Sequence, residues 1–307
     1  MKIAIIGQAA FGRDVLTSLI AQKENIVAVI CPPDASPDRI DPLKTSALER
    51  GIPVLQYKKM RSPEAIEKFV SLSVDLCVMA FVTDIVPDEI LESPTHGTIQ
   101  YHPSLLPKYR GPSSINWPII YGEKETGLSI FWPDKGLDTG PVLIQKTVSI
   151  EPDDTLGSLY FQKLFPLGVE AMCEAVSLVK KGEAPKIQQD HSLSSYQGWC
   201  SSNDVKIDWG MSTKQVFDLI RGSDPSPGAN STYEGHKVSF FGANILGDNS
   251  VAEPGSVTEI TDSQISIATK DGSISVQRLK IGRGAKISAP EYATETNMSV
   301  GDRFSDS

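Results

Sequence analysis

The sequence predicts an α/β protein, with a doubly wound, mainly parallel sheet domain followed by a small β-barrel domain. Over the first two hundred residues, short apolar runs alternate with helical segments, which is the pattern of βαβ units. The runs over Lys2–Ile6 and Asp75–Phe81 are continuous rather than alternating, as in central parallel strands that are buried on both faces. From Lys237 onward, short strands separated by turn residues replace this alternation.

The elements of the first domain follow in order along the chain. We expect strands at Lys2–Ile6, Asn25–Cys31, Pro53–Leu55, Asp75–Phe81, Thr98–His102 and Leu128–Trp132. We expect helices at Phe11–Gln22, Leu43–Arg50, Pro63–Leu72, Pro87–Leu91 and Asp154–Lys181, the last interrupted at Pro166. Because ligands of such sheets bind at the carboxyl ends of the strands, we look for the site there.

The composition shifts after residue 185. Residues 186–203 are rich in Ser and Gln and are expected to form a linker. A short helix is expected at Ser212–Gly222, and Asp271-Gly272 is a hairpin signal. The later strands are expected at Lys237–Ala243, Gly255–Ile260, Gln264–Ala268 and Ser273–Ile281. We therefore divide the chain into an α/β domain over residues 1–203, linker included, and a barrel domain over residues 204–307.

The composition is that of a soluble, cytoplasmic protein. The 307 residues are 40% hydrophobic and 22% charged, with a net charge of −9, which favours neither nucleic acid nor an anionic membrane as a partner. No apolar run approaches the roughly 18 residues of a membrane helix, and the opening MKIAIIGQ is expected to be a strand rather than a signal peptide. The four cysteines are far apart, which argues against a metal site or a disulfide scaffold and fits a reducing compartment.

Two segments carry the candidate chemistry. In the first, a strand ends at His102 and a loop with Pro107 and Gly111 follows; period-two alternation places Gln100 and His102 on one face. The second, over residues 131–140, follows another strand and carries Asp138 in a glycine-rich loop. A lone His at a strand end is more often a structural residue, and Asp138 has an alternative role as a turn former. Together, however, the two loops offer groups suited to acid–base catalysis.

These segments resemble a known family. The string HGTIQYHPSLLPKYRGPSSINW, followed by GLSIFWPDKGLDTGPVL, is similar to the folate-dependent formyltransferases. The resemblance is strongest to the branch formed by the N-terminal hydrolase domain of 10-formyltetrahydrofolate dehydrogenase, and it extends to methionyl-tRNA formyltransferase. It covers most of the chain and implies a Rossmann-like formyltransferase domain followed by an OB-like barrel.

The resemblance also implies roles for individual residues. The family's catalytic trio is Asn, His and Asp; His102 and Asp138 match the last two, and the Asn position falls on Gln100, which carries its carboxamide about one methylene further out. Arg110 either contacts the substrate or caps its loop. The residues expected to hold the folate, largely through backbone groups, are Met79, Ala80, Phe81, Val82 and Val86, with Trp132, Asp134, Gly136 and Leu137.

The resemblance further implies 10-formyltetrahydrofolate as formyl donor. We expect no metal, and no NAD(P) for this chain alone, because the dehydrogenase's further domains do not fit within 307 residues. The Gly7–Gly12 turn lacks the middle glycine of a dinucleotide fingerprint and is expected to be structural.

The acceptor of the formyl group is left open. The tRNA formyltransferases carry a basic loop after the second strand, whereas Pro32–Pro42 has three Asp and one Arg. We therefore expect water, a small molecule or a carrier-bound group as the acceptor, and we expect no tRNA or membrane partner. A methionyl-tRNA formyltransferase and a non-catalytic folate-binding protein are the alternatives, and a dinucleotide-binding protein is a third.

Overall fold

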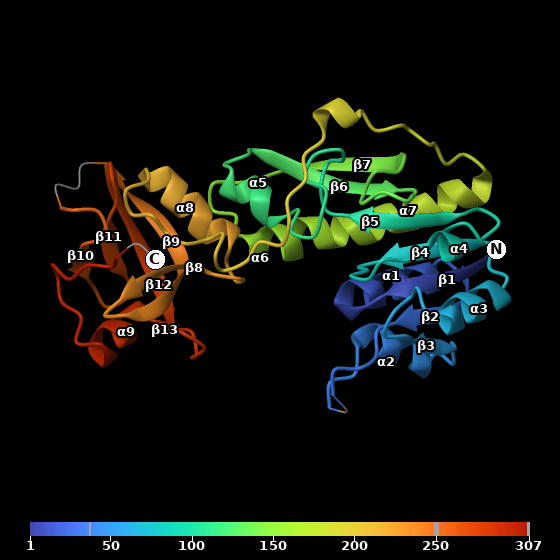
Figure 1. Cartoon of the computed structure of the whole chain (residues 1–307), viewed down its shortest axis with the longest axis horizontal. Coiled ribbons are helices and arrows are strands. Elements are labelled where there is room, and N and C mark those ends of the chain that lie inside the picture. Colours follow the sequence, from blue (N-terminus) through green and yellow to red (C-terminus); the bar gives the residue numbers. More distant parts are fainter. Residues whose placement is uncertain (37, 249–251, 306–307) are drawn as a thin grey trace. The chain divides into compact units, whose positions relative to one another are not determined.

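The chain divides into two compact units, each assembled from several segments (Figure 1). The computed structural model describes residues 1–36, 38–248 and 252–305. Pro37 of the expected 32–42 loop, and residues 249–251 and 306–307 of the expected barrel domain, lie outside the described residues. The first unit comprises Met1–Pro112, Gly127–Val148 and Gln162–Tyr196, and the second comprises Ser113–Thr126, Ser149–Phe161 and Gln197–Ser307.

The first unit is built on a seven-stranded sheet. In spatial order its strands are β3 (Val54–Gln56), β2 (Asn25–Cys31), β1 (Lys2–Gly7), β4 (Leu76–Ala80), β5 (Thr98–His102), β6 (Glu125–Phe131) and β7 (Val142–Ser149). The pairs from β3 to β5 are parallel, and β6 runs antiparallel to β5. This mainly parallel sheet confirms the predicted α/β class.

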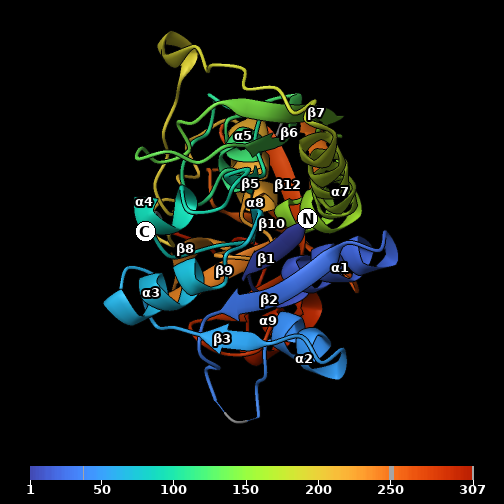
Figure 2. The same cartoon turned by 90° about the vertical axis from the view of Figure 1, so that its right-hand side faces the viewer.

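Helices cover both faces of this sheet (Figure 2). They are α1 (Ala9–Ala21), α2 (Pro42–Glu49), α3 (Pro63–Ser71), α4 (Asp88–Leu91) and α7 (Phe165–Lys181). On one face Phe11 of α1 packs against Tyr101 of β5, with ring centroids 4.3 Å apart, and against Phe165 of α7, at 5.4 Å. On the other face Phe69 of α3 and Ile90 of α4 join the core beneath β1 and β4. The unit is therefore doubly wound.

Local sequence signals explain where several helices begin. The side chains of Asp41 and Ser62 accept hydrogen bonds from backbone N–H groups in the first turns of α2 and α3. Each is followed by a proline, which is well suited to the first helical position because an N–H there would have no partner within the helix. The helical stretch expected over 154–181, with its interruption at Pro166, consists of α6 (Leu156–Ser158), a π-helical segment over Leu159–Leu164, and α7. Pro166 lies in the first turn of α7, so a new helix begins where an interruption was expected.

The strand β7, the helix α5 and a short 3-10 helix over His191–Leu193 were not predicted. After two buried residues, the strand β7 alternates between half-buried and exposed positions, which is typical of an edge strand. The helix α5 (Asn116–Ile120) contains Pro118 and is too short to show helical periodicity.

The second unit holds an antiparallel sheet in the order β10-β11-β12-β9-β8, with β13 paired to β12. Its elements are α8 (Thr213–Gly222), β8 (Ala229–Tyr233), β9 (His236–Asp248), β10 (Val257–Ile260), β11 (Ile265–Ala268), β12 (Gly272–Ile281), β13 (Ile287–Ser288) and α9 (Ala289–Glu295). The C-terminal segment joins the two edges of this sheet. Ser305 exchanges backbone hydrogen bonds of 3.2 and 2.9 Å with Thr232 of β8, and Val257 of β10 donates to the carbonyl of Asp302 at 2.7 Å. Pairing at both edges gives the closure expected of a small barrel.

Within the parts of the chain that the structure describes, no helix has the length and apolar character needed to cross a membrane.

Phe304 is a central packing residue of the barrel. Its buried ring lies 5.0 Å from that of Phe240 and 6.0 Å from that of Trp209. We predict that Phe304→Ala lowers the free energy of unfolding by about 3–5 kcal/mol, because it leaves a cavity among aromatic rings. Urea titration measures the change, with exposed Val300→Ala as the control. A loss below about 1 kcal/mol would contradict this role of Phe304.

Candidate functional site

His102 is the last residue of β5 and lies on the sheet face opposite α1. Its neighbour Tyr101 packs on Phe11, so alternation along the strand turns Gln100 and His102 to the other face. His102 is only 5% exposed, and its ring meets that of Phe131 edge-on with the centroids 6.5 Å apart. The buried ring is therefore held in one orientation.

Two contacts define the chemistry of this histidine. Its Nε2 lies 2.9 Å from the carbonyl oxygen of Tyr109, which only accepts, so Nε2 carries a hydrogen. Its Nδ1 faces Oδ2 of Asp138 at 3.6 Å, a distance too long for a direct hydrogen bond but short enough for charge stabilisation. Nδ1 is therefore the nitrogen available to take or give a proton.

Asp138 lies beside His102 although the strand that precedes its loop, β6, ends at the opposite end of the sheet from β5. Because β6 is antiparallel to β5, Phe131 at its end lies opposite Gln100 rather than His102. The following loop must extend along β5 to bring Asp138 to His102, where its Oδ2 also accepts a 2.9 Å hydrogen bond from the backbone N–H of Gly111. The two candidate loops are thus brought together, although they begin at opposite ends of the sheet, because the carboxyl ends of β5 and β6 point in opposite directions.

Side chains within the Asp138 loop hold its shape. Oδ1 of Asp134 accepts hydrogen bonds from the backbone N–H of Gly136, at 3.0 Å, and from the Thr139 hydroxyl. A Cβ on Gly136 would lie 2.0 Å from Oγ1 of Thr139, and a Cβ on Gly140 would lie 1.8 Å from the carbonyl oxygen of Trp132. Both positions therefore require glycine, and Asp134 acts as a loop-forming residue.

The loop after His102 is anchored from β6 and β7. The hydroxyl of Ser129 donates to the carbonyl of Ser104 at 2.7 Å and accepts from the N–H of Leu106 at 3.1 Å. Nε2 of Gln145 donates to the Leu106 carbonyl at 2.6 Å. These bonds fix the turn that carries Tyr109 back to His102.

Arg110 is 9% exposed and braces its own loop against a later segment. Its Nη2 donates to Oε1 of Gln189 at 2.6 Å and to Nδ1 of His191 at 3.0 Å. Of the two expected roles for Arg110, these contacts show the loop-bracing one. Gln189 and His191 were missed by sequence reasoning, because they lie in the Ser- and Gln-rich stretch expected to be a linker and carry no local motif.

Residues with a strained backbone follow several strands of the first sheet. Among the described residues, eight non-glycine residues have positive φ, and four of these follow β1, β4, β5 and β6. They are Ala9 (φ 58°), Phe81 (φ 63°), Tyr109 (φ 56°) and Asp138 (φ 55°). Each such conformation costs of the order of 1–3 kcal/mol and persists only where neighbouring contacts impose it. Strain of this kind is typical of functional sites.

The residues expected to hold a folate fall into two groups. The side chains of Met79, Ala80 and Val86 are buried, and Trp132 is 8% exposed with its indole N–H bound to the Pro185 carbonyl at 2.9 Å. The side chains of these residues are therefore used in packing, which leaves their backbone groups as the parts that could contact a ligand. The second group is more accessible and consists of Phe81 (44% exposed), Leu137 (54% exposed), Val82, Asp134 and Gly136.

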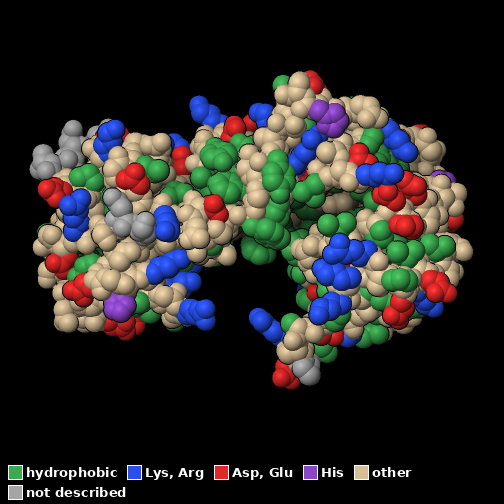
Figure 3. All heavy atoms as spheres, viewed as in Figure 1, with side chains coloured by type: hydrophobic (Ala, Val, Ile, Leu, Met, Phe, Trp, Pro, Cys, Tyr) green, Lys and Arg blue, Asp and Glu red, His purple; other side chains and the backbone are tan. Residues whose placement is uncertain are grey.

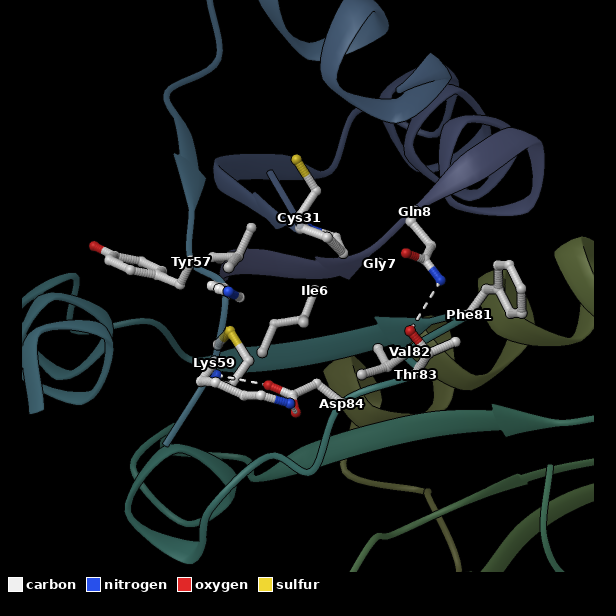
Figure 4. Close-up of a pocket in the computed structure, with 14 residues that line it drawn as sticks. Ile6, Gly7, Gln8, Cys31, Tyr57, Lys59, Phe81, Val82, Thr83 and Asp84 are labelled. Carbon is white, nitrogen blue, oxygen red and sulfur yellow. Dashed lines mark hydrogen bonds and ion pairs between the residues drawn. The ribbon is translucent and has the colours of Figure 1, made fainter. Parts of the chain in front are cut away.

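A cavity of about 180 Å³ opens beside the Phe81 loop, at the ends of β1, β2 and β4 (Figure 4). Gln8 points across it and donates to the Thr83 hydroxyl at 3.3 Å, and Lys59 pairs with Asp84 at 3.4 Å. Burial, with the nearby Asp41 and Asp34, raises the pKa of the Cys31 thiol in its wall to about 12, so this thiol is protonated at neutral pH.

The Gly7 turn that lines this cavity is structural. A Cβ on Gly7 would lie 2.3 Å from the Ala80 carbonyl oxygen, so glycine is needed for strand packing. At the start of α1 the backbone N–H of Ala9 donates to both carboxylate oxygens of Asp41, at 2.8 and 3.1 Å. The chain's own carboxylate thus occupies the place where a helix N-terminus would bind a ligand's phosphate. No group of three or more His, Cys, Asp or Glu suited to a metal ion occurs in the described part of the chain.

Comparison with known proteins identifies the family. Residues 1–176 match the model of the formyl transferase family, and residues 200–297 match that of the formyl transferase C-terminal domain. The chain belongs to the formyl transferase family. This family membership confirms the resemblance drawn from the sequence motifs.

Relatives in the family differ in their reactions. The chain is 38% identical to human mitochondrial 10-formyltetrahydrofolate dehydrogenase over 98% of its own length but only 34% of that protein. It is 33% identical to methionyl-tRNA formyltransferase of Geobacter metallireducens over 99% of its own length and 98% of that protein. The chain therefore spans about a third of the length of the dehydrogenases it matches.

Solved structures share the fold. HypX from Aquifex aeolicus, in complex with tetrahydrofolic acid, superposes with a TM-score of 0.71 at 21% identity, covering 98% of this chain and 48% of that one. An N-formyltransferase from Helicobacter canadensis, in complex with folinic acid and dTDP-3-aminofucose, has a TM-score of 0.67 at 19% identity, covering 90% and 98%.

Gly140 gives a direct test of the Asp138 loop. We predict that Gly140→Ala displaces this loop, because the added Cβ would overlap the Trp132 carbonyl, and lowers the free energy of unfolding by about 1–3 kcal/mol. Chemical denaturation measures the change. Gly198→Ala is the matched control, since an added Cβ there meets no atom within 4 Å. Equal stability of the two variants would show that the loop does not need this glycine.

Proposed function

We propose that the chain binds 10-formyltetrahydrofolate and removes its formyl group. The acceptor in this proposal is water, which gives tetrahydrofolate and formate, or a small or carrier-bound molecule. The observation that carries it is the buried pairing of His102 Nδ1 with Asp138 Oδ2 at 3.6 Å, in a chain of the formyl transferase family. The proposal uses no metal and, for this chain alone, no NAD(P).

The geometry supports a specific division of labour. The attacking group must lose a proton while the formyl carbonyl becomes an oxyanion. Because Nε2 of His102 is bound to the Tyr109 carbonyl, Nδ1 takes that proton, and Asp138 stabilises the imidazolium that forms. The same Nδ1–H then donates a proton to the leaving folate nitrogen.

Gln100 is the proposed hydrogen-bond donor to the oxyanion. It lies two residues before His102 on the same face of β5 and is half-buried. A preorganised donor to an oxyanion contributes about 3 kcal/mol to catalysis. The longer Gln side chain thus replaces the family Asn in this proposal.

The folate site is proposed to lie between the loops that follow β4 and β6, the two neighbours of β5. Phe81 and Leu137 support this position, because both are large apolar side chains that remain 44% and 54% exposed on these loops. A flat pterin ring gains binding energy by covering such surface.

The loop over 32–42 supports a non-tRNA acceptor. Asp34 pairs with Lys44, and Asp41 caps α2 and binds the start of α1, so these acids build the loop itself. On the visible face of the first unit, several basic side chains gather in one patch, and most acidic side chains lie elsewhere on that face (Figure 3). Methionyl-tRNA formyltransferase is the second candidate, because the chain matches such an enzyme over nearly its full length. Two results together would favour that candidate. The protein would formylate Met-tRNA, and it would release no formate from 10-formyltetrahydrofolate when Met-tRNA is left out.

Removing either member of the pair tests the proposal. We predict that His102→Ala and Asp138→Ala each lower formate release from 10-formyltetrahydrofolate by about 100-fold or more, while circular dichroism stays unchanged. Exposed His96→Ala and Asp153→Ala are the matched controls and should keep the wild-type rate. A His102 or Asp138 variant with near-wild-type turnover would overturn the assignment. Folate binding without turnover, whatever the acceptor, would instead show a non-catalytic binding protein.

A further inference from the structure

The side-chain carboxamide of Gln189 forms hydrogen bonds to two loops of the site through both its nitrogen and its oxygen. It is 8% exposed, in the segment that follows α7. Its Nε2 donates to the carbonyl oxygens of Asp138, at 2.9 Å, and Gly140, at 2.7 Å. Its Oε1 accepts from Nη2 of Arg110 at 2.6 Å. Both N–H donors are therefore used on the Asp138 loop, and the acceptor is used on the loop after His102.

Arg110 makes this link strong. Its guanidinium is buried, and its Nε has no hydrogen-bond partner among the described residues. The charge is met by neutral acceptors, Oε1 of Gln189 and Nδ1 of His191. A hydrogen bond from a buried cation is about twice as strong as one between neutral groups, so Gln189 is firmly fixed in place.

Gln189 binds the backbone of the Asp138 loop, which has an unfavourable conformation at Asp138. Asp138 has a φ of 55°, which is unfavourable for a residue with a Cβ, and its loop must extend along β5 to reach His102. The two carbonyls bound by Gln189 lie on either side of Thr139, so its hydrogen bonds fix the peptide plane that follows Asp138 and the one that follows Gly140. These two hydrogen bonds add to those from Gly111 and Asp134, which also hold the loop in its strained conformation.

We propose that Gln189, anchored by Arg110, is a positioning residue that keeps the Asp138 carboxylate against His102. Its effect on turnover rests on the proposed function, whereas its effect on the geometry of the His102–Asp138 pair does not. Gln189 touches no reacting atom in this account and acts through the Asp138 backbone.

Gln189→Met tests this role, because it keeps the length of the side chain and removes all three hydrogen bonds. We expect kcat for formate release to fall about 10-fold or more, as misplacement of a catalytic group does, with KM for 10-formyltetrahydrofolate within about 3-fold of wild type. Gln188→Met is the matched control, because the neighbouring Gln188 is exposed. Gln189→Glu, which keeps an acceptor for Arg110 but loses both donors, should behave like Gln189→Met; it also replaces that variant if Gln189→Met does not fold.

A second readout needs no turnover. The ¹⁵N resonance of His102 Nδ1, assigned with the His102→Ala variant, reports the distance and charge of Asp138. We expect it to shift in Gln189→Met and to stay in place in Gln188→Met. An unchanged resonance with unchanged kcat in folded Gln189→Met would overturn the positioning role. If the wild type releases no formate and formylates no acceptor, the proposed function fails, and the resonance alone still decides the role of Gln189.

Discussion

The site depends on one topological constraint, the antiparallel pairing of β6 with β5. This pairing places Phe131 opposite Gln100, so the loop that follows must extend along β5 before Asp138 meets His102. The loop is held in that course by its own Asp134, by close backbone packing at Gly140, and by the N–H of Gly111 at the carboxylate. The strained φ of Asp138 is the local cost, of the order of 1–3 kcal/mol, and these contacts offset it.

The same constraint decides which atoms of the histidine do the chemistry. The turn held by Ser129 brings the Tyr109 carbonyl to Nε2, and the Asp138 loop approaches from the other side, at Nδ1. One nitrogen is thus bound to the protein backbone, and the other faces the carboxylate. In the proposed function, this arrangement acts on the formyl group whatever its acceptor. We attribute the choice of acceptor to the surrounding loops, including the acidic 32–42 loop, in which Asp41 already fills the start of α1.

The sequence predicted most of the first sheet because its strands are short apolar runs with clear boundaries; the expected strands Asn25–Cys31 and Thr98–His102 coincide with β2 and β5. It missed β7, whose half-exposed alternation resembles a polar loop, and α5, which is too short for periodicity.

Motif and alternation together singled out His102 and Asp138. They could not single out Gln189 or the Tyr109 carbonyl, because a backbone carbonyl has no residue signature and Gln189 acts 51 positions away from Asp138. Contacts of this kind are set by tertiary structure alone.

In the proposed function His102 and Asp138 act as one unit, and a double-mutant cycle on formate release tests this coupling. Rates are measured for His102→Ala, Asp138→Ala and the double variant, with 10-formyltetrahydrofolate saturating. If Asp138 works by stabilising the charge on His102, the double variant loses about as much activity as His102→Ala alone, because the second group has no partner left to assist. If the two losses instead multiply, the residues act independently, and the account of a paired site is contradicted.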